Sequence, residues 1–200
     1  MTLQFREIEH KFLVPPDFRK DEFLSAARGL QPLRETAVHV RDTYFVVPKN
    51  PGFIYRYRLD EELQQLTVKS FEDPANRLEV NLDLDMKPGS QKDRVFAFME
   101  TFGVAWSGTI EKRVNVCVFK NCEVVYYSAT YRERKIHCVE FEAENCETLA
   151  EAAGVLKNYE TKLGFDQRQR EKRSLFELLV FPEHEELKQY LAKEKKSEFT

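Results

Sequence analysis

The sequence predicts an α+β fold in which eight antiparallel strands close into a β-barrel with helices packed outside. Apolar and polar residues alternate with period two over much of the chain, which is typical of half-buried strands. Helical patterns interrupt these strands at three places. No linker or repeat divides the chain, and a sheet with this many strands tends to close or to curl. A single domain built around such a sheet is therefore expected.

Five strands and two helices are expected in the first half of the chain. The first helix, 17–28, follows Pro15-Pro16 and stops before Gly29. The second helix begins at Ser90, whose hydroxyl suits an N-cap, and ends near Gly103. The strands are predicted over residues 5–14, 39–47, 52–59, 63–71 and 77–85.

The second half of the chain is expected to hold three strands and a further helix. The helix 148–163 has one apolar face and is closed by Gly164. The pattern of 168–180 fits a strand or a helix equally, and the charged residues 181–200 are expected to form a helix that frays into a tail. The domain is accordingly placed at 1–180. The three strands are predicted over residues 108–120, 122–131 and 135–144.

Composition excludes several classes of function. Apolar residues make up 42% of the chain and charged residues 32%, and no apolar run approaches the roughly 20 residues that span a bilayer. The first residues contain no apolar signal core, so a cytoplasmic protein without a membrane partner is expected. The net charge of −3 argues against binding nucleic acid by bulk charge. The four cysteines show no zinc-ligand spacing.

Alternation places basic and acidic side chains together on one face of several predicted strands. For one strand alone, a polar face in contact with water is the simpler interpretation. The recurrence of arginine pairs and glutamate pairs favours a shared interior instead, because arginine suits phosphate and paired carboxylates suit a divalent cation. These faces carry Glu7, Glu9 and Lys11; Arg56 and Arg58; Thr67 and Lys69; Arg77 and Glu79; and Glu140 and Glu142.

The ordered series of these motifs resembles the CYTH superfamily of triphosphate tunnel metalloenzymes, over about residues 3–180. Glu7-Ile8-Glu9-His10-Lys11 resembles the E-x-E-x-K signature at the start of that family's first strand. The resemblance rests on the order of the whole series and not on this motif alone. The other matching segments are Asp42-Thr43-Tyr44-Phe45, Arg56-Tyr57-Arg58, Thr67-Val68-Lys69, Arg77-Leu78-Glu79, Glu140-Phe141-Glu142 and the segment 173–179.

The chain also departs from the family pattern. The usual K-x-R is replaced by adjacent Lys112 and Arg113, of which only one can face the interior without a bulge. The apolar residues that share a face with Lys112 indicate the outer side, so Arg113 is expected to point inward. The segment 128–135 is rich in arginine, and Leu175 replaces the family's closing tyrosine. These departures leave the expected fold unchanged, but they make the resemblance less informative about the substrate.

The resemblance implies a metal-dependent hydrolase that releases the terminal phosphate of a small-molecule triphosphate, with Mg²⁺ or Mn²⁺ activating the attacking water. Tripolyphosphate and a small organic triphosphate such as thiamine triphosphate are both possible substrates, and a monomer or a homodimer is expected. A class IV adenylyl cyclase is the main alternative, and a non-catalytic polyphosphate-binding module is the second. The implied phosphate ligands are Lys11, Arg56, Arg58, Lys69, Arg77 and Arg113; the implied metal ligands are Glu7, Glu9, Glu79, Glu140 and Glu142; and the implied catalytic residues are Glu7, Glu9, Lys11, Glu140 and Glu142.

Overall fold

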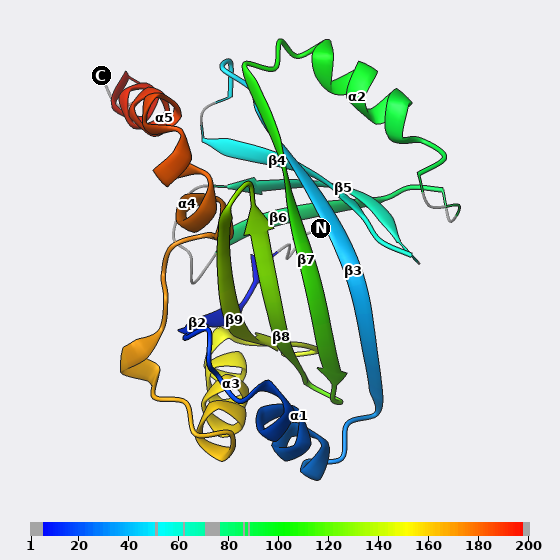
Figure 1. Ribbon diagram of the computed structural model, residues 1–200, viewed down its shortest axis with the longest axis vertical. Helices are drawn as coiled ribbons and strands as arrows, with labels where there is room; N and C mark the ends of the chain where they lie inside the picture. The colour runs from blue at the N-terminus through cyan, green and yellow to red at the C-terminus, as the bar shows by residue number, and fades with distance from the viewer. Residues whose placement is uncertain are drawn as a thin grey trace.

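One antiparallel sheet curls around an interior, and helices pack on its outside and at one of its ends (Figure 1). This arrangement is seen in a computed structural model that describes residues 6–50, 52–61, 63–70, 77–85, 87 and 89–197. Within these residues, no helix is both long and apolar enough to cross a membrane. The fold is α+β, as the sequence predicts.

The described part of the sheet contains nine strands, hydrogen-bonded in the order β1-β6-β5-β4-β3-β7-β8-β9-β2. Strands β1 and β2 are consecutive parts of the segment that the sequence predicts as a single first strand, which reconciles nine strands with the predicted eight. The strands are β1 (Arg6–Glu7), β2 (Glu9–Val14), β3 (Arg34–Val46), β4 (Phe53–Leu59), β5 (Gln64–Ser70), β6 (Arg77–Asp83), β7 (Trp106–Val118), β8 (Cys122–Tyr131) and β9 (Arg134–Ala143).

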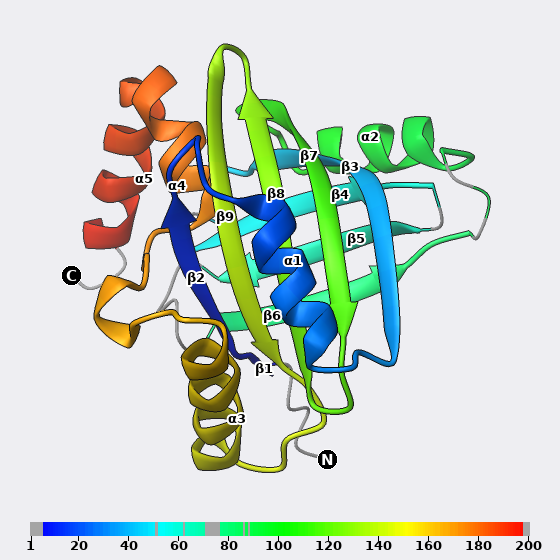
Figure 2. The same ribbon diagram turned by 60° about the horizontal axis from the view of Figure 1, so that its bottom comes forward.

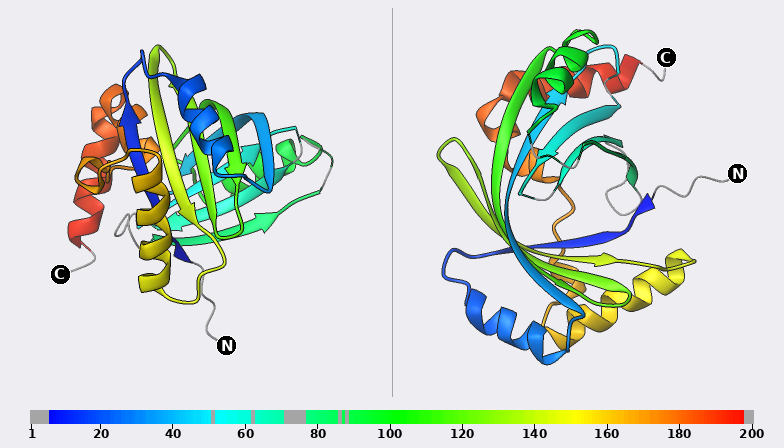
Figure 3. Two further views of the ribbon diagram at one scale, coloured as in Figure 1. Left: turned by 90° about the horizontal axis from the view of Figure 1, so that it is seen from below. Right: turned by 90° about the vertical axis from the view of Figure 1, so that its right-hand side faces the viewer.

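The predicted closed barrel is corrected to a curled sheet that does not close fully (Figure 3). Strand β2 pairs with β9 along its whole length, from Glu9 opposite Glu142 to Val14 opposite His137. Strand β1 pairs with β6 at only two positions among the described residues. The two ends of the hydrogen-bonded order therefore meet only through the short β1 segment. Alternation predicts which face of a strand each side chain occupies, but it carries no information on whether β1 pairs with β6.

Two groups of helices cover the outer face of the sheet (Figure 2). Helices α1 (Lys20–Gly29) and α3 (Leu149–Lys162) pack over the outer faces of β2, β8 and β9, where Phe12, Val124 and Phe141 are buried. Helix α2 (Lys92–Glu100) packs separately over β3 and β4. Two apolar cores thus cover the outer face of the sheet, and charged side chains of several strands point to the interior.

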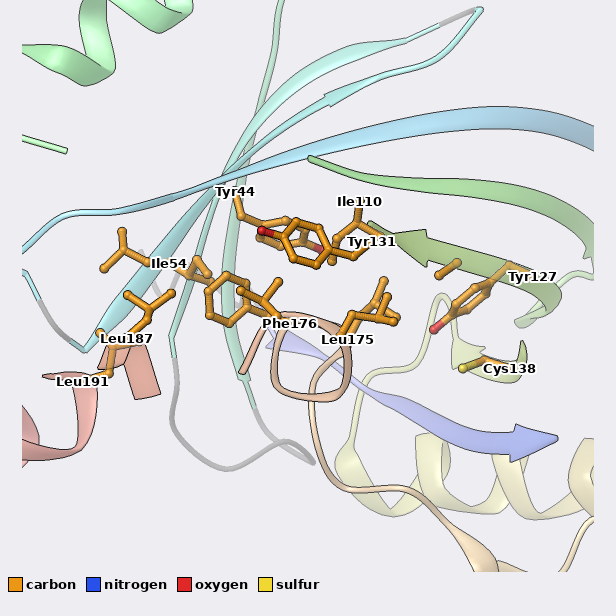
Figure 4. Close-up of a cluster of buried hydrophobic side chains, with 14 residues drawn as sticks. Tyr44, Ile54, Ile110, Tyr127, Tyr131, Cys138, Leu175, Phe176, Leu187 and Leu191 are labelled. Atoms are coloured by element: carbon orange, nitrogen blue, oxygen red, sulfur yellow. The ribbon is translucent and has the colours of Figure 1, made fainter. Parts of the chain in front are cut away.

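The third apolar core closes one end of the interior. Helix α4 (Leu175–Leu179) inserts Leu175 and Phe176 beside Tyr44 and Ile54 of the inner sheet face (Figure 4). Helix α5 (Glu185–Ser197) adds buried leucines to the same cluster. Ser174 begins α4 with a reciprocal capping box, which accounts for a helix of only five residues at this point. The segment 168–180, which fitted either a strand or a helix, thus contains this helix and part of a preceding 3₁₀ turn.

A buried carboxylate ties α3 to the sheet. Glu160 of α3 is fully buried, and its Oε1 lies 2.6 Å from Nδ1 of His10 on β2. Arg170 Nη2 donates to its other oxygen at 3.1 Å. Burial would raise the pKa of Glu160, but the hydrogen bonds from His10 and Arg170 outweigh burial and lower it. The carboxylate therefore remains ionised and links α3 and the segment that follows it to the distant strand β2.

The Glu160→Gln variant is expected to lower the free energy of unfolding by about 2 kcal/mol, because an amide cannot accept from both partners with the strength of a carboxylate. Urea denaturation at pH 7 measures the loss. Since the folded pKa of Glu160 is lowered, its contribution is present at neutral pH and is lost as the pH falls through that value. The exposed Lys157→Gln variant of the same helix is the control, and equal stability of the two variants would contradict the account.

Candidate functional site

The inner face of the curled sheet encloses a cavity of about 840 Å³. Alternate residues of strands β2 to β9 line it, as the period-two pattern requires. The segment that leads into α4 lines it as well. The charged lining residues are Glu9, Lys11, Arg34, Arg56, Arg58, Asp60, Lys69, Glu79, Lys112, Glu123, Glu140, Glu142, Lys172, Arg173 and Glu177.

Asp42 anchors a first cluster of charges in the wall. Its side chain is completely buried, and both carboxylate oxygens accept from Arg58, at 2.8 and 3.0 Å. Lys112 Nζ lies 2.6 Å from the Oδ2 atom of the same carboxylate. Three neighbouring strands contribute one residue each. Asp42 on β3 stands directly opposite Arg58 on β4. Lys112 on β7 stands opposite Val40, which is two residues from Asp42 on the same face of β3. The cluster carries two positive charges and one negative charge.

Burial and pairing change the titration of this cluster. Burial alone would raise the pKa of Asp42, but Arg58 and Lys112 outweigh it and hold that pKa well below its usual range. Burial and the nearby Arg58 guanidinium lower the pKa of Lys112 to about 8. Asp42 is therefore ionised at neutral pH, whereas Lys112 changes its charge within the range in which enzymes are assayed.

Glu79 forms the centre of a second cluster. Its carboxylate lies 3.3 Å from Arg56 Nη2 and forms an ion pair with Lys69. Arg56 also donates to Thr67 Oγ1 at 3.0 Å. The Nε atom of Arg56 is buried and has no hydrogen-bond partner in the part of the chain that the structure describes. A buried donor without a partner is uncommon in a native protein, and an oxygen atom of a bound anion would satisfy it.

Lys11 lies within a third cluster, which is acidic. Its Nζ atom is 3.3 Å from Glu140 Oε1 and 3.8 Å from Glu9 Oε1. Strand pairing brings Glu9 directly opposite Glu142 and Lys11 directly opposite Glu140. Tyr127 donates from its hydroxyl to Glu140 at 2.7 Å, and burial together with the Glu140 carboxylate raises its pKa well above the usual value. Tyr127 therefore remains a hydrogen-bond donor that holds Glu140 in place.

The acidic cluster has the right chemistry for a hard divalent cation, because Glu9, Glu140 and Glu142 offer carboxylate oxygens from two paired strands. Among the described residues, however, no three acidic, histidine or cysteine side chains form a ready-made metal site. Instead, the Lys11 ammonium group lies beside two of the carboxylates. Carboxylate oxygens suit a hard cation such as Mg²⁺ or Mn²⁺, but Lys11 would have to leave Glu9 and Glu140 before these residues and Glu142 could hold one.

The structure brings together eight of the residues that the sequence singles out. For Glu7 and Arg77 it describes only the backbone, and these two positions face each other in the pairing of β1 with β6. Their side chains lie outside what is described, so their predicted roles stay predictions. The eight that line the cavity are Glu9, Lys11, Arg56, Arg58, Lys69, Glu79, Glu140 and Glu142.

The expectation that Arg113 points inward is wrong. Arg113 is exposed on the outer side of β7, whereas Lys112 is buried and lines the cavity. The sequence correctly places Lys112 on the same face as Val114 and Val116. The apolar face of β7 is its inner face, since these valines also line the cavity.

Sequence reasoning did not assign functional roles to several residues of the site. Asp42 was noted within a motif, but its role as the anchor of two cations depends on cross-strand register, which the sequence does not reveal. Tyr127 lies outside every motif of the sequence, so nothing there marks it as the partner of Glu140. Lys172 and Arg173 precede a short helix whose position could not be predicted. Of these two residues, only Arg173 lies in a segment that resembles the family, namely 173–179.

Comparison with known proteins shows similarity in fold. No protein-family model and no curated protein matches the sequence. The PH1012 protein from Pyrococcus horikoshii matches the structure with a TM-score of 0.71 and 17% identity, covering 86% of this chain and 99% of that chain. A "putative adenylate cyclase" from Bacillus halodurans matches with a TM-score of 0.60 and 16% identity, covering 87% and 97% of the two chains.

HpAC1 from Hippeastrum is a third match, with a TM-score of 0.58 and 16% identity over 88% of this chain and 95% of that chain. It is described as an adenylyl cyclase candidate with a dominant triphosphatase activity. At such identities the likeness establishes a shared fold. This fold is consistent with the resemblance to the CYTH superfamily that the motifs indicate.

Proposed function

We propose that the protein is a divalent-metal-dependent triphosphatase that binds its substrate in the cavity of the curled sheet. The observation that carries this proposal is the convergence of Arg56, Lys69 and Lys112 on one cavity that also contains an acidic cluster. A cavity with both signs of charge suits a polyanion that arrives with metal ions. The triphosphatase activity described for HpAC1, which has the same fold, supports it.

The cationic residues bind the phosphate groups in this proposal. Arg56 donates from its buried Nε atom, and Lys69 and Lys112 neutralise further oxygen atoms. Arg58 is held by Asp42 through two hydrogen bonds, so it presents its charge from a fixed position. Lys11 contributes another charge once it leaves the carboxylates. Catalysis then depends mainly on positioning and on neutralising the charge of the transition state.

The acidic residues would hold the metal ions and would orient water. Glu9, Glu140 and Glu142 would bind Mg²⁺ or Mn²⁺, and Glu7 and Glu79 are further candidates. A bound cation would offset phosphate charge and favour ionisation of water at neutral pH. A carboxylate of this group orients the water for in-line attack on the terminal phosphorus, and Tyr127 keeps Glu140 in the required position.

A class IV adenylyl cyclase remains the second candidate, because two of the three solved structures compared above are described as adenylate cyclase candidates. In that reaction a ribose hydroxyl group attacks the α-phosphate. The same cations would serve both reactions, so the product distinguishes them.

Product analysis over a panel of substrates tests the proposal. Tripolyphosphate, thiamine triphosphate and ATP are each incubated with Mg²⁺ or Mn²⁺, and free phosphate and cyclic AMP are measured. A triphosphatase releases phosphate and loses this activity in excess chelator. Formation of cyclic AMP without release of terminal phosphate would favour the cyclase, and full activity in chelator would exclude the metal-dependent mechanism.

Substrate binding is expected to weaken as the pH rises through about 8, because Lys112 loses its proton with a pKa of about 8. A bound polyanion favours the protonated lysine, so affinity is highest below this pKa and falls by at most about tenfold per pH unit above it. Dissociation constants for tripolyphosphate between pH 7 and 9, at constant free Mg²⁺, measure the effect. The Lys112→Arg variant should lack this decline, and an identical decline in both proteins would rule out Lys112 as its source.

A further inference from the structure

An apolar surface adjoins the cationic clusters inside the same cavity. It consists of Val38, Val40, Val114, Val116 and Val125, which we call the valine wall. Val40 is 4% exposed, and the other four are partly exposed in the described structure. These side chains line the cavity and lie outside the apolar cores under α1, α2 and α3, although Val114 and Val125 also pack against the core that α4 closes.

The valine wall is continuous across three strands. Val38 stands opposite Val114, and Val116 stands opposite Val125. Val40 stands opposite Lys112, so the wall begins at the cluster anchored by Asp42. From Val40 the wall extends along β3 to Thr36. These two residues are four positions apart, which corresponds to about 13 Å at the rise of an extended strand.

Charged and polar residues limit the wall at its far end. Arg34 lies two residues beyond Thr36 and lines the cavity, as does Glu123 at the corresponding end of β8. The apolar stretch is therefore bounded on both sides by charged groups. The stretch is long enough to accommodate a single ring or a short branched chain.

The exposed part of this surface would not strengthen the binding of inorganic tripolyphosphate. Every outer atom of tripolyphosphate is an oxygen, and contact with valine would remove water from these oxygens without replacing their hydrogen bonds. An apolar group on the ligand would instead gain free energy by covering the valine methyl groups. Valine side chains also offer no hydrogen bonds with which to recognise sugar hydroxyls.

We propose that the ligand of this cavity carries a compact apolar organic group attached to its polyphosphate, and that the valine wall binds this group. The inference rests on the proposed triphosphatase function and narrows its substrate class to organic triphosphates with an apolar substituent. The polyphosphate binds at Arg56, Lys69 and Lys112, and the substituent extends from Lys112 toward Thr36.

Binding calorimetry with three matched probes tests the inference. The probes are tripolyphosphate, benzyl triphosphate and ribose 5-triphosphate, each with methylene groups in place of the bridging oxygens so that hydrolysis cannot consume them. The wild-type protein is expected to bind the benzyl probe about tenfold more tightly than either of the other two, at the same Mg²⁺ concentration. In the Val114→Thr/Val116→Thr double variant, this preference is expected to fall to about twofold or less.

The Val80→Thr variant is the matched control, because Val80 is 37% exposed on the outer side of β6. It should keep the preference for the benzyl probe, and thermal unfolding of both variants checks that they fold. Equal affinity of the wild type for all three probes, or an unchanged preference in the double variant, would overturn the role of the valine wall while leaving the triphosphatase proposal intact. Failure of all three probes to bind would overturn the proposed function and this inference with it.

Discussion

The Glu140→Gln variant is expected to lose phosphate release from triphosphates by about 10³-fold, because a carboxylate that orients the attacking water and binds metal is replaced by a neutral amide. The substitution conserves size, and the amide oxygen can still accept the hydrogen bond from Tyr127. The fold should therefore persist. Steady-state phosphate release at saturating Mg²⁺ measures the loss.

A binding measurement separates catalysis from structure in this variant. Without added metal, Glu140→Gln is expected to bind tripolyphosphate at least as tightly as the wild type, since one carboxylate that repels the polyanion has been removed. The exposed Glu111→Gln variant on the outer side of β7 is the control for the loss of one acidic residue. Phosphate release by Glu140→Gln within about threefold of the wild type would remove Glu140 from the catalytic group.

The Asp42→Asn variant is expected to lower the free energy of unfolding by about 3–5 kcal/mol, because it leaves Arg58 and Lys112 as neighbouring cations without a counterion. Urea denaturation at pH 7 measures this loss. The folded pKa of Asp42 lies well below its usual range, so its stabilising contribution is present at neutral pH and is lost as the pH falls through that value. The difference between variant and wild type should therefore shrink in acid.

The exposed Asp93→Asn variant of α2 provides a matched control, and its effect should stay below about 1 kcal/mol. If Asp42→Asn is as stable as this control, the buried cluster does not contribute to the stability of the fold. If the variant is destabilised but equally so at low pH, the pairing of Asp42 with its two cations is not the cause.

Side-chain alternation predicted the two faces of most strands, and hence most of the charged residues that line the cavity. Arg56 with Arg58 and Glu140 with Glu142 line the cavity because residues two apart share a face of a strand. The same rule fails to say which face is the inner one. Strand β7 shows this most clearly, since its cavity face carries Lys112 together with valines, whereas the sequence alone suggests that an apolar face is the outer one.

Features that depend on pairing between distant strands could not be predicted. The contact of Asp42 with Arg58 and Lys112 requires the register of β3 with β4 and β7. The degree of closure depends on how β1 pairs with β6, and alternation within a strand carries no signal for it. The position of α4 at the end of the interior depends on a core assembled from several strands and α5.

A crystal structure of the protein with tripolyphosphate and Mn²⁺, with the metal located by anomalous scattering, tests the central claim most directly. The account predicts tripolyphosphate inside the cavity, with an oxygen within hydrogen-bond distance of Arg56 Nε. It also predicts manganese bound by Glu140 together with Glu9 or Glu142, and Lys11 turned toward phosphate. Tripolyphosphate bound outside the curled sheet, or manganese bound away from these carboxylates, would contradict it.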